Sequence, residues 1–530
     1  MKIKKIYQFL LLFASLSMNQ ACNESLLDED PKSTLAPDNT FVSTQGFETA
    51  LTGLYVQVRD EWGWYAGGLT YAPMFAGTDL SVTGNRHPHI TPFEDYADNI
   101  YSSTTIVNAY WNWAYTTIAN ANLIIEAADN EEVNWKSPSD KNRIKAEARF
   151  IRAYAYRELI YLYGDVPLVD QVYRPFRLDF ERNPVSEVVH FMIEDLKFAV
   201  EYLPETAGID GKLVKGAAQH LLAETYLKAN QPDLAEQSAS DLINSGVFQL
   251  MQTRFGNHLQ EEGDVFSDLF KEHNQNRTSG NLESIWVIQQ EYNVNGGGAE
   301  RFTDWSRRAW GPYYSQINGM TLCDSLGGRS LGRLIPLDWW IDAYEEDDIR
   351  ASKHNIRKEY WYNNPEHENY GEKVEMTEEW KKSGTLYPST TKFYFGKSDD
   401  DPSYLNNDKD RVKFRLAETY LLLAEAHLAQ GELDKAANAI NTVRNRANAS
   451  PITAGQVSLD FILDERAREL FGEVPRRITL NRVGKLLERV KQYNPLSVHT
   501  IRDYHVLWPI PQTAIDANSE AVLEQNEGYE

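Results

Sequence analysis

Apolar residues recur with a helical period through much of the chain. Between residues 145 and 163 one stripe has positions spaced by three or four, namely Ala148, Ile151, Ala155, Leu159 and Leu162. A second face carries Phe150, Tyr154 and Tyr161. Because both faces are apolar, we predict a helix that packs on two sides. It should end at Gly164-Asp165-Val166-Pro167, since glycine and proline terminate helices.

A second pattern is an internal repeat whose two copies lie about 200 residues apart. Residues 222–227 are followed by Asn230 and then by 233–235, and residues 423–428 are followed by Gly431 and then by 434–436. The spacing of small and bulky residues matches tetratricopeptide repeats, in which small residues let paired helices approach closely. We therefore predict two helical hairpins of one stacked array, with the intervening chain as an excursion from it.

The excursion, residues 251–410, differs in amino-acid composition from the helical parts. It is rich in glycine and proline pairs, such as Gly296-Gly297-Gly298 and Gly311-Pro312, and in tryptophan and tyrosine. Binding sites are often built on such loops when a rigid scaffold holds them. Residues 296–336 also contain five arginines and only three acids, although the whole chain is strongly acidic.

The first thirty residues direct the chain to a membrane. A basic start with three lysines precedes an apolar stretch too short to span a bilayer, and Ala21-Cys22 is followed by the acidic run Asp28-Glu29-Asp30. We predict a signal peptide over 1–21, lipidation of Cys22 and an acidic tether over 22–45. Secretion with a free N-terminal cysteine is the alternative.

Composition excludes some classes of function. The formal charge of −24 becomes −27 once the three lysines of residues 1–21 are removed, so nucleic acid is not an expected partner. Aromatic residues make up 12% of the chain, and Tyr and Trp suit ligands that have apolar faces and polar rims, such as sugars. For any single aromatic residue, a place in the core is the more common outcome.

Catalytic and metal sites find little support. A glycosidase needs two carboxylates across a cleft, whereas Glu94-Asp95 and residues 345–348 are adjacent acids, which we interpret as solvated faces. His87-Pro88-His89 is at most half of a metal site, and residues 327–332 lack the Lys-Ser/Thr of a phosphate loop. We interpret Cys323 as a buried structural thiol. No enzyme activity, metal or cofactor is expected.

Several blocks, in order along the chain, resemble the SusD/RagB family of outer-membrane nutrient-uptake lipoproteins. They are residues 50–55, 119–124, 147–154, 163–169, 414–426, 440–447, 464–473, 508–512 and 525–529. The resemblance implies a mainly α-helical fold with tetratricopeptide-like pairs, in one compact domain with regions 46–250, 251–410 and 411–530. It also implies a lipid-anchored protein on the outer face of the outer membrane, which holds glycan, or less often peptide, for a SusC-like TonB-dependent transporter. A tetratricopeptide scaffold that binds only proteins is the third alternative.

In that family, exposed loop aromatics form a shallow platform for sugar rings, and no motif fixes their positions. We select candidates that lie among glycines, prolines and arginines without an apolar period, namely Trp305, Trp310, Tyr313 and Tyr314. Trp64 and Tyr96 are added from the N-terminal loops. Arg301, Arg307 and Arg308 are candidates for uronate or sulfate groups, with plain surface charge as the alternative. Residues 337–344 read as a helix, so at least one of Trp339 and Trp340 should be core.

Overall fold

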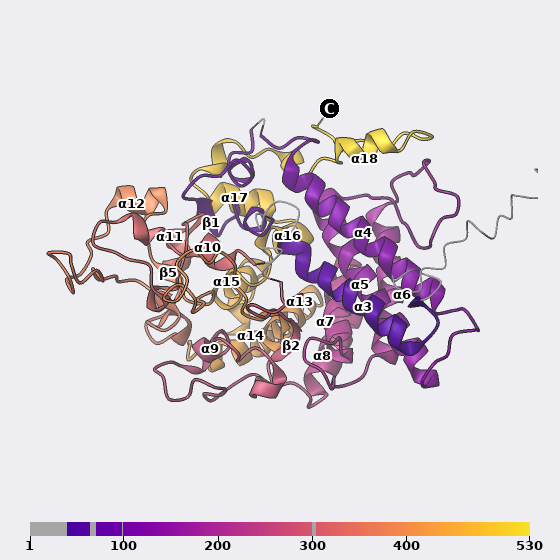
Figure 1. The fold of residues 1–530 in the computed structure, drawn as a ribbon, viewed down its shortest axis with the longest axis horizontal. Coiled ribbons are helices and arrows are strands. Elements are labelled where there is room, and N and C mark those ends of the chain that lie inside the picture. The colour runs from indigo at the N-terminus through magenta and orange to yellow at the C-terminus, as the bar shows by residue number, and fades with distance from the viewer. Residues whose placement is uncertain (1–39, 64–69, 98, 299–303, 530) are drawn as a thin grey trace, which may run out of the picture.

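The computed structural model describes residues 40–63, 70–97, 99–298 and 304–529 (Figure 1). The predicted signal peptide, most of the tether, Cys22, Trp64 and Arg301 lie outside these residues. The longer helices are α3 (Thr44–Arg59), α4 (Thr105–Ala127), α5 (Pro138–Tyr163), α6 (Val185–Tyr202), α7 (Lys215–Lys228), α8 (Pro232–Asn244), α13 (Leu416–Ala429), α14 (Leu433–Arg446), α15 (Leu459–Glu469) and α17 (Leu486–Tyr493).

The remaining elements are short. The helices are α9 (Val265–Asp268), α10 (Ser306–Trp310), α11 (Asp338–Asp342), α12 (Glu378–Ser383), α16 (Arg476–Arg482) and α18 (Gln512–Ala517). The strands are β1 (Ser81–Thr83), β2 (Ser284–Ile288), β3 (Leu334–Pro336), β4 (Ile356–Arg357), β5 (Ser389–Thr390) and β6 (Arg411–Arg415), which form three two-stranded antiparallel sheets. The fold is mainly α-helical, as predicted.

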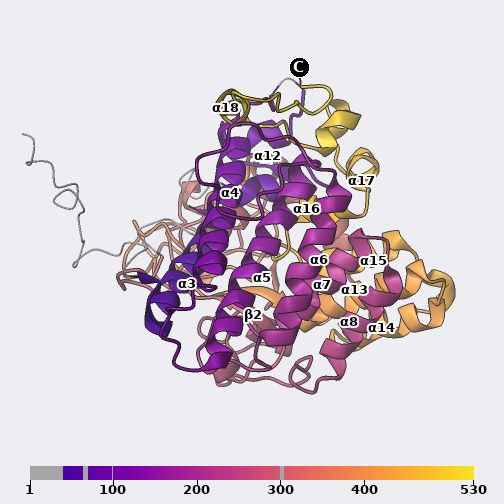
Figure 2. The same cartoon turned by 90° about the vertical axis from the view of Figure 1, so that its right-hand side faces the viewer.

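Helix α5 forms the centre of the N-terminal half and is buried on both faces. Ser137 and Asp140 form a capping box at its first turn, and Gly164 ends it with a φ of 75°, which favours glycine. It packs against α3, α4, α6 and α16. These long helices lie side by side in Figures 1 and 2. The predicted helix that packs on two sides is confirmed.

The repeated segments form two helix pairs, α7 with α8 and α13 with α14. Gly431 adopts a φ of 76° in the second turn, and Asn230 takes the equivalent left-handed conformation in the first. Helix α8 packs against α13, so the two pairs stack although about 200 residues separate them. Ala223 and Ala424 are buried where the paired helices meet. The predicted stacked array is confirmed.

The excursion is closed at its base by strand pairing. Strand β2 pairs antiparallel with β6, so residues 284–288 of the excursion lie beside the strand that follows its C-terminal end. Trp286 of β2 is buried, and its ring packs edge-on against Phe150 and Tyr154 of α5, with centroids 5.3 and 5.7 Å apart. Most of the short helices and strands between them gather on the left in Figure 1, at the end away from α3 to α6.

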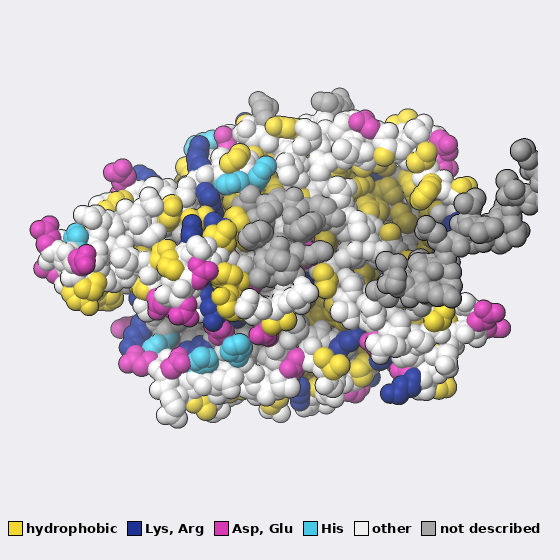
Figure 3. All heavy atoms as spheres, viewed as in Figure 1, with side chains coloured by type: hydrophobic (Ala, Val, Ile, Leu, Met, Phe, Trp, Pro, Cys, Tyr) yellow, Lys and Arg dark blue, Asp and Glu magenta, His cyan; other side chains and the backbone are white. Residues whose placement is uncertain are grey.

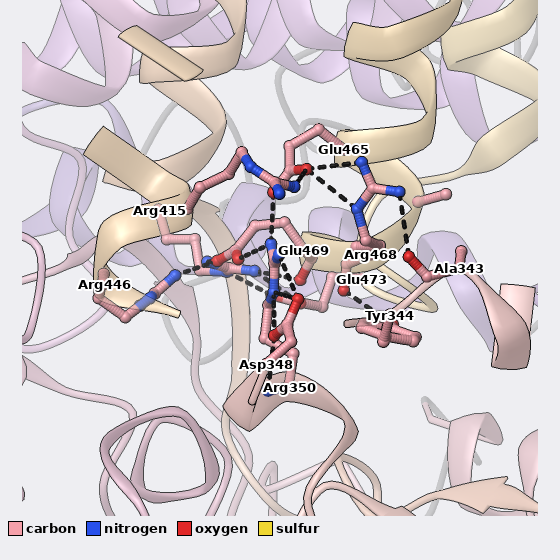
Figure 4. A network of polar contacts seen from close by, with 12 residues as sticks. Ala343, Tyr344, Asp348, Arg350, Arg415, Arg446, Glu465, Arg468, Glu469 and Glu473 are labelled. Atoms are coloured by element: carbon pink, nitrogen blue, oxygen red, sulfur yellow. Dashed lines mark hydrogen bonds and ion pairs between the residues drawn. The ribbon is translucent and has the colours of Figure 1, made fainter. Parts of the chain in front are cut away.

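A buried network of ion pairs fastens this region to the C-terminal helices (Figure 4). Glu465 and Glu469 of α15 lie at its centre, and Arg350 of the excursion contacts them at 2.7 and 3.0 Å. Arg415 of β6 contacts Glu469 at 2.5 Å, and Arg446 of α14 also pairs with it. Glu465 also pairs with Arg468 of its own helix at 2.7 Å.

Within the part of the chain that the structure describes, none of the helices has both the length and the apolar composition of a membrane span.

Candidate functional site

The excursion brings four separate segments together beside β1 and β3. The register pairs Thr83 with Leu334, and just beyond the strands the amide of Asn85 donates to the carbonyl of Gly332 at 2.7 Å. Gly332 in turn donates to Gly311 at 2.8 Å, and Tyr313 donates to Gly384 at 2.9 Å. These backbone contacts place residues 83–89, 305–314, 329–334 and 384 at one surface.

Two glycines make this close approach possible. Gly332 and Gly384 have φ values of 58° and 76°, and a Cβ on either one would collide with the carbonyl oxygen of the other. The backbones pack face to face only because neither residue carries a side chain. Side chains on the flanking residues are consequently brought into one group.

We call this group the basic aromatic surface, and define it as Trp305, Arg308, Tyr313, Arg329, Arg333 and His87. Trp305 and Tyr313 are partly exposed. The Arg308 guanidinium lies 3.9 Å from the centroid of the Trp305 ring, a close cation–π contact. Figure 3 shows basic and histidine side chains beside apolar ones over the region of β1 and α10.

Arg308 has an unusual environment for a charged group. It is only 7% exposed, yet its Nε and Nη1 atoms have no hydrogen-bond acceptor among the described residues. Burial lowers the pKa of Arg308, and repulsion from Arg329, Arg333 and Arg307 lowers it further, to about 10. The guanidinium is therefore charged at neutral pH and faces other cations.

The two neighbouring arginines are held by backbone carbonyls. Arg333 donates from Nη1 to the carbonyl of Asn85 at 2.8 Å, and Arg329 donates from Nη1 to that of Pro402 at 3.0 Å. Carbonyl oxygens fix these side chains without cancelling their charge. Both arginines therefore add to the positive potential around Arg308.

His87 completes the group as a neutral ring. Burial lowers its pKa, and the charges of Arg333, His89 and Arg308 lower it further, to about 4. The rings of His87 and His89 are 5.4 Å apart. Among the described residues, the one cluster of three metal-ligating side chains lies elsewhere, at Glu236, His427 and Glu432, where Lys435 already pairs with Glu432 at 2.8 Å.

Three of the predicted platform aromatics prove to be core residues. Trp310 is 1% exposed, and its indole Nε1 donates to the Tyr71 hydroxyl at 2.5 Å. Tyr314 is buried with its hydroxyl on the Gly328 carbonyl at 3.0 Å, and Tyr96 is buried with its hydroxyl on the Gly77 carbonyl at 3.0 Å. A ring enclosed on all sides cannot stack on a sugar, so these three predictions were wrong.

Arg307 was also wrongly predicted to face a ligand. It is buried, and its guanidinium donates to the carbonyls of Phe395, Tyr404 and Asn406 at 3.2, 3.1 and 3.0 Å. Burial lowers its pKa to about 10. It ties residues 395–406 to α10. Of the described candidates, Trp305 and Tyr313 therefore remain partly exposed, and Arg308, although only 7% exposed, lies against the Trp305 ring.

The interpretation of the adjacent acids as solvated faces was wrong for two of them. Glu94 is buried and accepts a hydrogen bond from the Thr83 hydroxyl at 2.8 Å. Asp348 is buried and pairs with Arg350 at 2.7 Å.

The predicted burial of Cys323 was only partly right, because this residue is partly buried, with Sγ 3.3 Å from the Ser325 hydroxyl. Trp340 is core and Trp339 is partly exposed, as the pattern predicted.

Some residues with binding potential were not selected from sequence. Arg329 and Arg333 lie twenty residues or more from Arg308 in sequence, and only the backbone pairing brings them near it. Trp361 is 44% exposed and borders a separate hollow of about 560 Å³ that is also lined by Lys353, His354 and Arg357. The surplus of arginine over acid in residues 296–336 could have pointed to Arg329 and Arg333. Nothing in the sequence around Trp361 indicates that its side chain is exposed.

Comparisons with known proteins place the chain. A family model described as "SusD family" matches residues 282–529, and one described as "Starch-binding associating with outer membrane" matches residues 26–227. SusD-like protein P25 of Formosa agariphila is 26% identical over 568 aligned residues that cover 100% of both chains. Starch-binding protein SusD of Bacteroides thetaiotaomicron is 26% identical over 434 residues, 75% of each chain.

The fold agrees with these matches. The crystal structure of a SusD superfamily protein from Bacteroides vulgatus superposes with a TM-score of 0.72 at 21% identity, over 92% of this chain and 100% of the other. The two family models together cover most of the chain, in the order that the sequence blocks predicted. This chain belongs to the SusD family, a family of non-enzymatic glycan-binding proteins associated with the outer membrane.

Proposed function

We propose that this protein is a lipid-anchored, surface-exposed glycan-binding protein. It captures oligosaccharide or polysaccharide and delivers it to a partner SusC-like TonB-dependent outer-membrane transporter. Family membership supports the class of ligand, and the similar relative from Bacteroides thetaiotaomicron is named as starch-binding. The short apolar segment, Cys22 and the acids after it support the anchor.

One structural observation carries the proposal for the site. Trp305 and Tyr313 are partly exposed aromatics at one surface, with hydrogen-bond donors from Arg308 and Arg333 beside them. Sugar rings have apolar C–H faces and hydroxylated rims. An aromatic ring can stack on the face, and the donors beside it can bind the hydroxyl groups of the rim. Protein scaffolding alone does not require such a pairing.

The test is binding of polysaccharides by native affinity electrophoresis and calorimetry. With a retained polysaccharide, Trp305→Ala should lower affinity by roughly 1 to 3 kcal/mol, by analogy with the stacking of bases on aromatic side chains. Phe176→Ala is the matched control, because it removes an aromatic ring that is 94% exposed in another loop. Full affinity in Trp305→Ala, or equal loss in both variants, would assign binding to another surface.

A further inference from the structure

Many buried arginines of this protein meet carboxylates, although Arg307 meets only backbone carbonyls. Arg350 pairs with Asp348, Arg152 with Asp195, and Arg476 with Asp79, each at 2.7 Å. The chain has 77 acidic residues against 53 basic ones, so carboxylates are in ample supply. Arg308 forms no ion pair with any described residue, and among the described arginines Arg411, which lies 3.9 Å from the Trp62 ring, likewise lacks hydrogen-bond acceptors. Arg308 differs in lying beside Arg329 and Arg333.

The described carboxylates nearest to Arg308 in sequence, and Asp401 near Arg329, have other partners. Asp304 accepts from the amide of Ser306 at 2.7 Å, and Asp324 accepts from the amide of Ser398 at 2.6 Å. Asp401 is exposed and accepts from the amide of Ser403 at 2.9 Å, and Arg329 contributes only weakly to the lowering of its pKa. Three cationic side chains, Arg308, Arg329 and Arg333, therefore share one surface, and none of the described carboxylates neutralises Arg308.

This arrangement costs stability in the free protein. A buried charge without a partner pays a desolvation penalty, and the like charges around it repel it. Trp305 offsets part of that cost through the cation–π contact at 3.9 Å. The arrangement is compensated fully when an anion occupies the position that a carboxylate takes beside Arg350, Arg152 and Arg476.

We propose that the basic aromatic surface binds an oxyanion substituent of the glycan, a sulfate ester or a uronate carboxylate, at Arg308. The proposal deepens the proposed function and rests on it. Arginine presents donors in a planar fork that matches both groups. Nε and Nη1 of Arg308 are enclosed, so Nη2 is the atom of this side chain that is left to meet a ligand. Trp305 and Tyr313 supply the stacking surface for the sugar ring that carries the substituent.

The negative net charge of the protein helps to distinguish specific binding of an acidic glycan from non-specific attraction. A polyanion is repelled by the overall charge of −24, so non-specific attraction does not account for its retention. Binding then requires a local site where the potential is positive, and the surplus of arginine over acid in residues 296–336 provides it. If Arg308 donates hydrogen bonds to the anion, affinity for the acidic glycan depends on this one side chain.

The experiment compares matched polysaccharides on the full mature chain. Sulfated and uronate-containing polysaccharides are each tested beside their desulfated or carboxyl-reduced forms, together with neutral glucans and a pool of acidic peptides. We expect an acidic polysaccharide to bind and its neutralised form to bind at least tenfold more weakly. Arg308→Gln should lose about tenfold to a hundredfold in affinity for the acidic form, the range of a hydrogen bond to a charged group.

Two controls separate a binding role from a structural one. Arg174→Gln removes an exposed arginine that pairs with Glu126 in another loop, and its affinity should be unchanged. Arg308 forms no hydrogen bond or ion pair with a described residue and is repelled by its cationic neighbours, which outweighs the cation–π contact with Trp305, so the melting temperature of Arg308→Gln should equal or exceed that of the wild type. Sodium sulfate should raise the melting temperature of the wild type more than that of Arg308→Gln, at an ionic strength matched with sodium chloride.

The outcomes distinguish the two proposals. If neutral glycans bind, acidic ones do not, and Arg308→Gln has no effect, the oxyanion proposal falls and the proposed function stands. If no polysaccharide binds, the proposed function itself fails. Preference for acidic peptides over every polysaccharide overturns both, and a melting temperature several degrees lower in Arg308→Gln shows that this arginine is structural.

Discussion

At the scale of residues, neighbours on the same short helix have different roles. Trp305 and Trp310 flank the arginines of α10, and only Trp305 reaches the surface. Trp310 instead fills the core between Phe75 and Phe471, with ring centroids 5.4 and 4.4 Å from theirs. Closeness in sequence therefore does not predict that the two tryptophans share a function.

This contrast predicts different phenotypes for the two tryptophans. Trp310→Ala should lower the free energy of unfolding by about 3 to 5 kcal/mol, because it leaves a cavity and removes the hydrogen bond to Tyr71. Trp305→Ala should lower that free energy much less, by about 1 kcal/mol, the value of a cation–π contact. Denaturant unfolding measures both, and equal destabilisation would show that Trp305 is also a core residue.

The basic aromatic surface predicts an unusual titration for His87. Its lowered pKa, about 4, means that the folded protein takes up this proton only well below pH 6.5, while the unfolded chain takes it up near 6.5. His87 therefore lowers stability as pH falls from 6.5 toward 4. An oxyanion bound at Arg308 should raise this pKa.

Proton NMR of the imidazole, assigned with a His87→Gln variant, measures the titration with and without an acidic polysaccharide. His89→Gln serves as the control for assignment, because His89 lies beside it. A pKa near 6.5 in the free protein would contradict the arrangement of cations described here.

At the scale of elements, the pattern of apolar positions predicted the long helices and their pairing. Helix α5 and the pairs α7–α8 and α13–α14 each repeat their apolar spacing over three or more turns. Helix α10 has five residues, too few to show any period, so Trp310 could not be recognised as core. The surface around Arg308 depends on the pairing of β1 with β3, which no local pattern encodes.

The ion-pair network predicts a specific sensitivity to acid. Burial raises the pKa of Glu465, but Arg350, Arg468 and Arg444 lower it to about 2, and neighbouring arginines also lower that of Glu469. A depressed folded pKa contributes stability that is present above pH 4.5 and lost as pH falls toward 2. The excursion should therefore detach from α15 in acid.

Removal of one carboxylate tests the network at neutral pH. Glu469→Gln should destabilise the fold by about 1.5 to 3 kcal/mol, the range for hydrogen bonds to charged groups, since Arg415 and Arg446 lose one buried carboxylate but keep their pairs with Glu283. Glu488→Gln is the matched control, because its exposed pair with Lys485 on α17 contributes little. A Glu469→Gln variant as stable as the control would mean that the network is not needed for the fold.

At the scale of the whole molecule, the proposal joins an anchor, a scaffold and a ligand surface. The stacked pairs α7–α8 and α13–α14 offer a broad helical face of the kind that repeat proteins use for protein contacts. We expect this face to contact the transporter, and purification in mild detergent should recover a barrel protein in about equal amount. Recovery of the lipoprotein alone would argue for a solitary binder.

The anchor gives a prediction for localisation. Cys22→Ala should release the protein to the soluble fraction, because acyl chains supply the membrane affinity. Alanine at Asp28, Glu29 and Asp30 should leave it lipidated but less accessible to protease added to intact cells. A Cys22→Ala protein that stays in the membrane pellet without its transporter would contradict the lipoprotein assignment.

The most direct test of the central claim is the crystal structure of the mature protein with a bound oligosaccharide from the polysaccharide that it retains. We predict a sugar ring stacked on Trp305, next to Tyr313, with an oxyanion substituent within hydrogen-bond distance of Arg308. A ligand seated instead in the hollow beside Trp361, with the surface around Arg308 empty, would contradict the account.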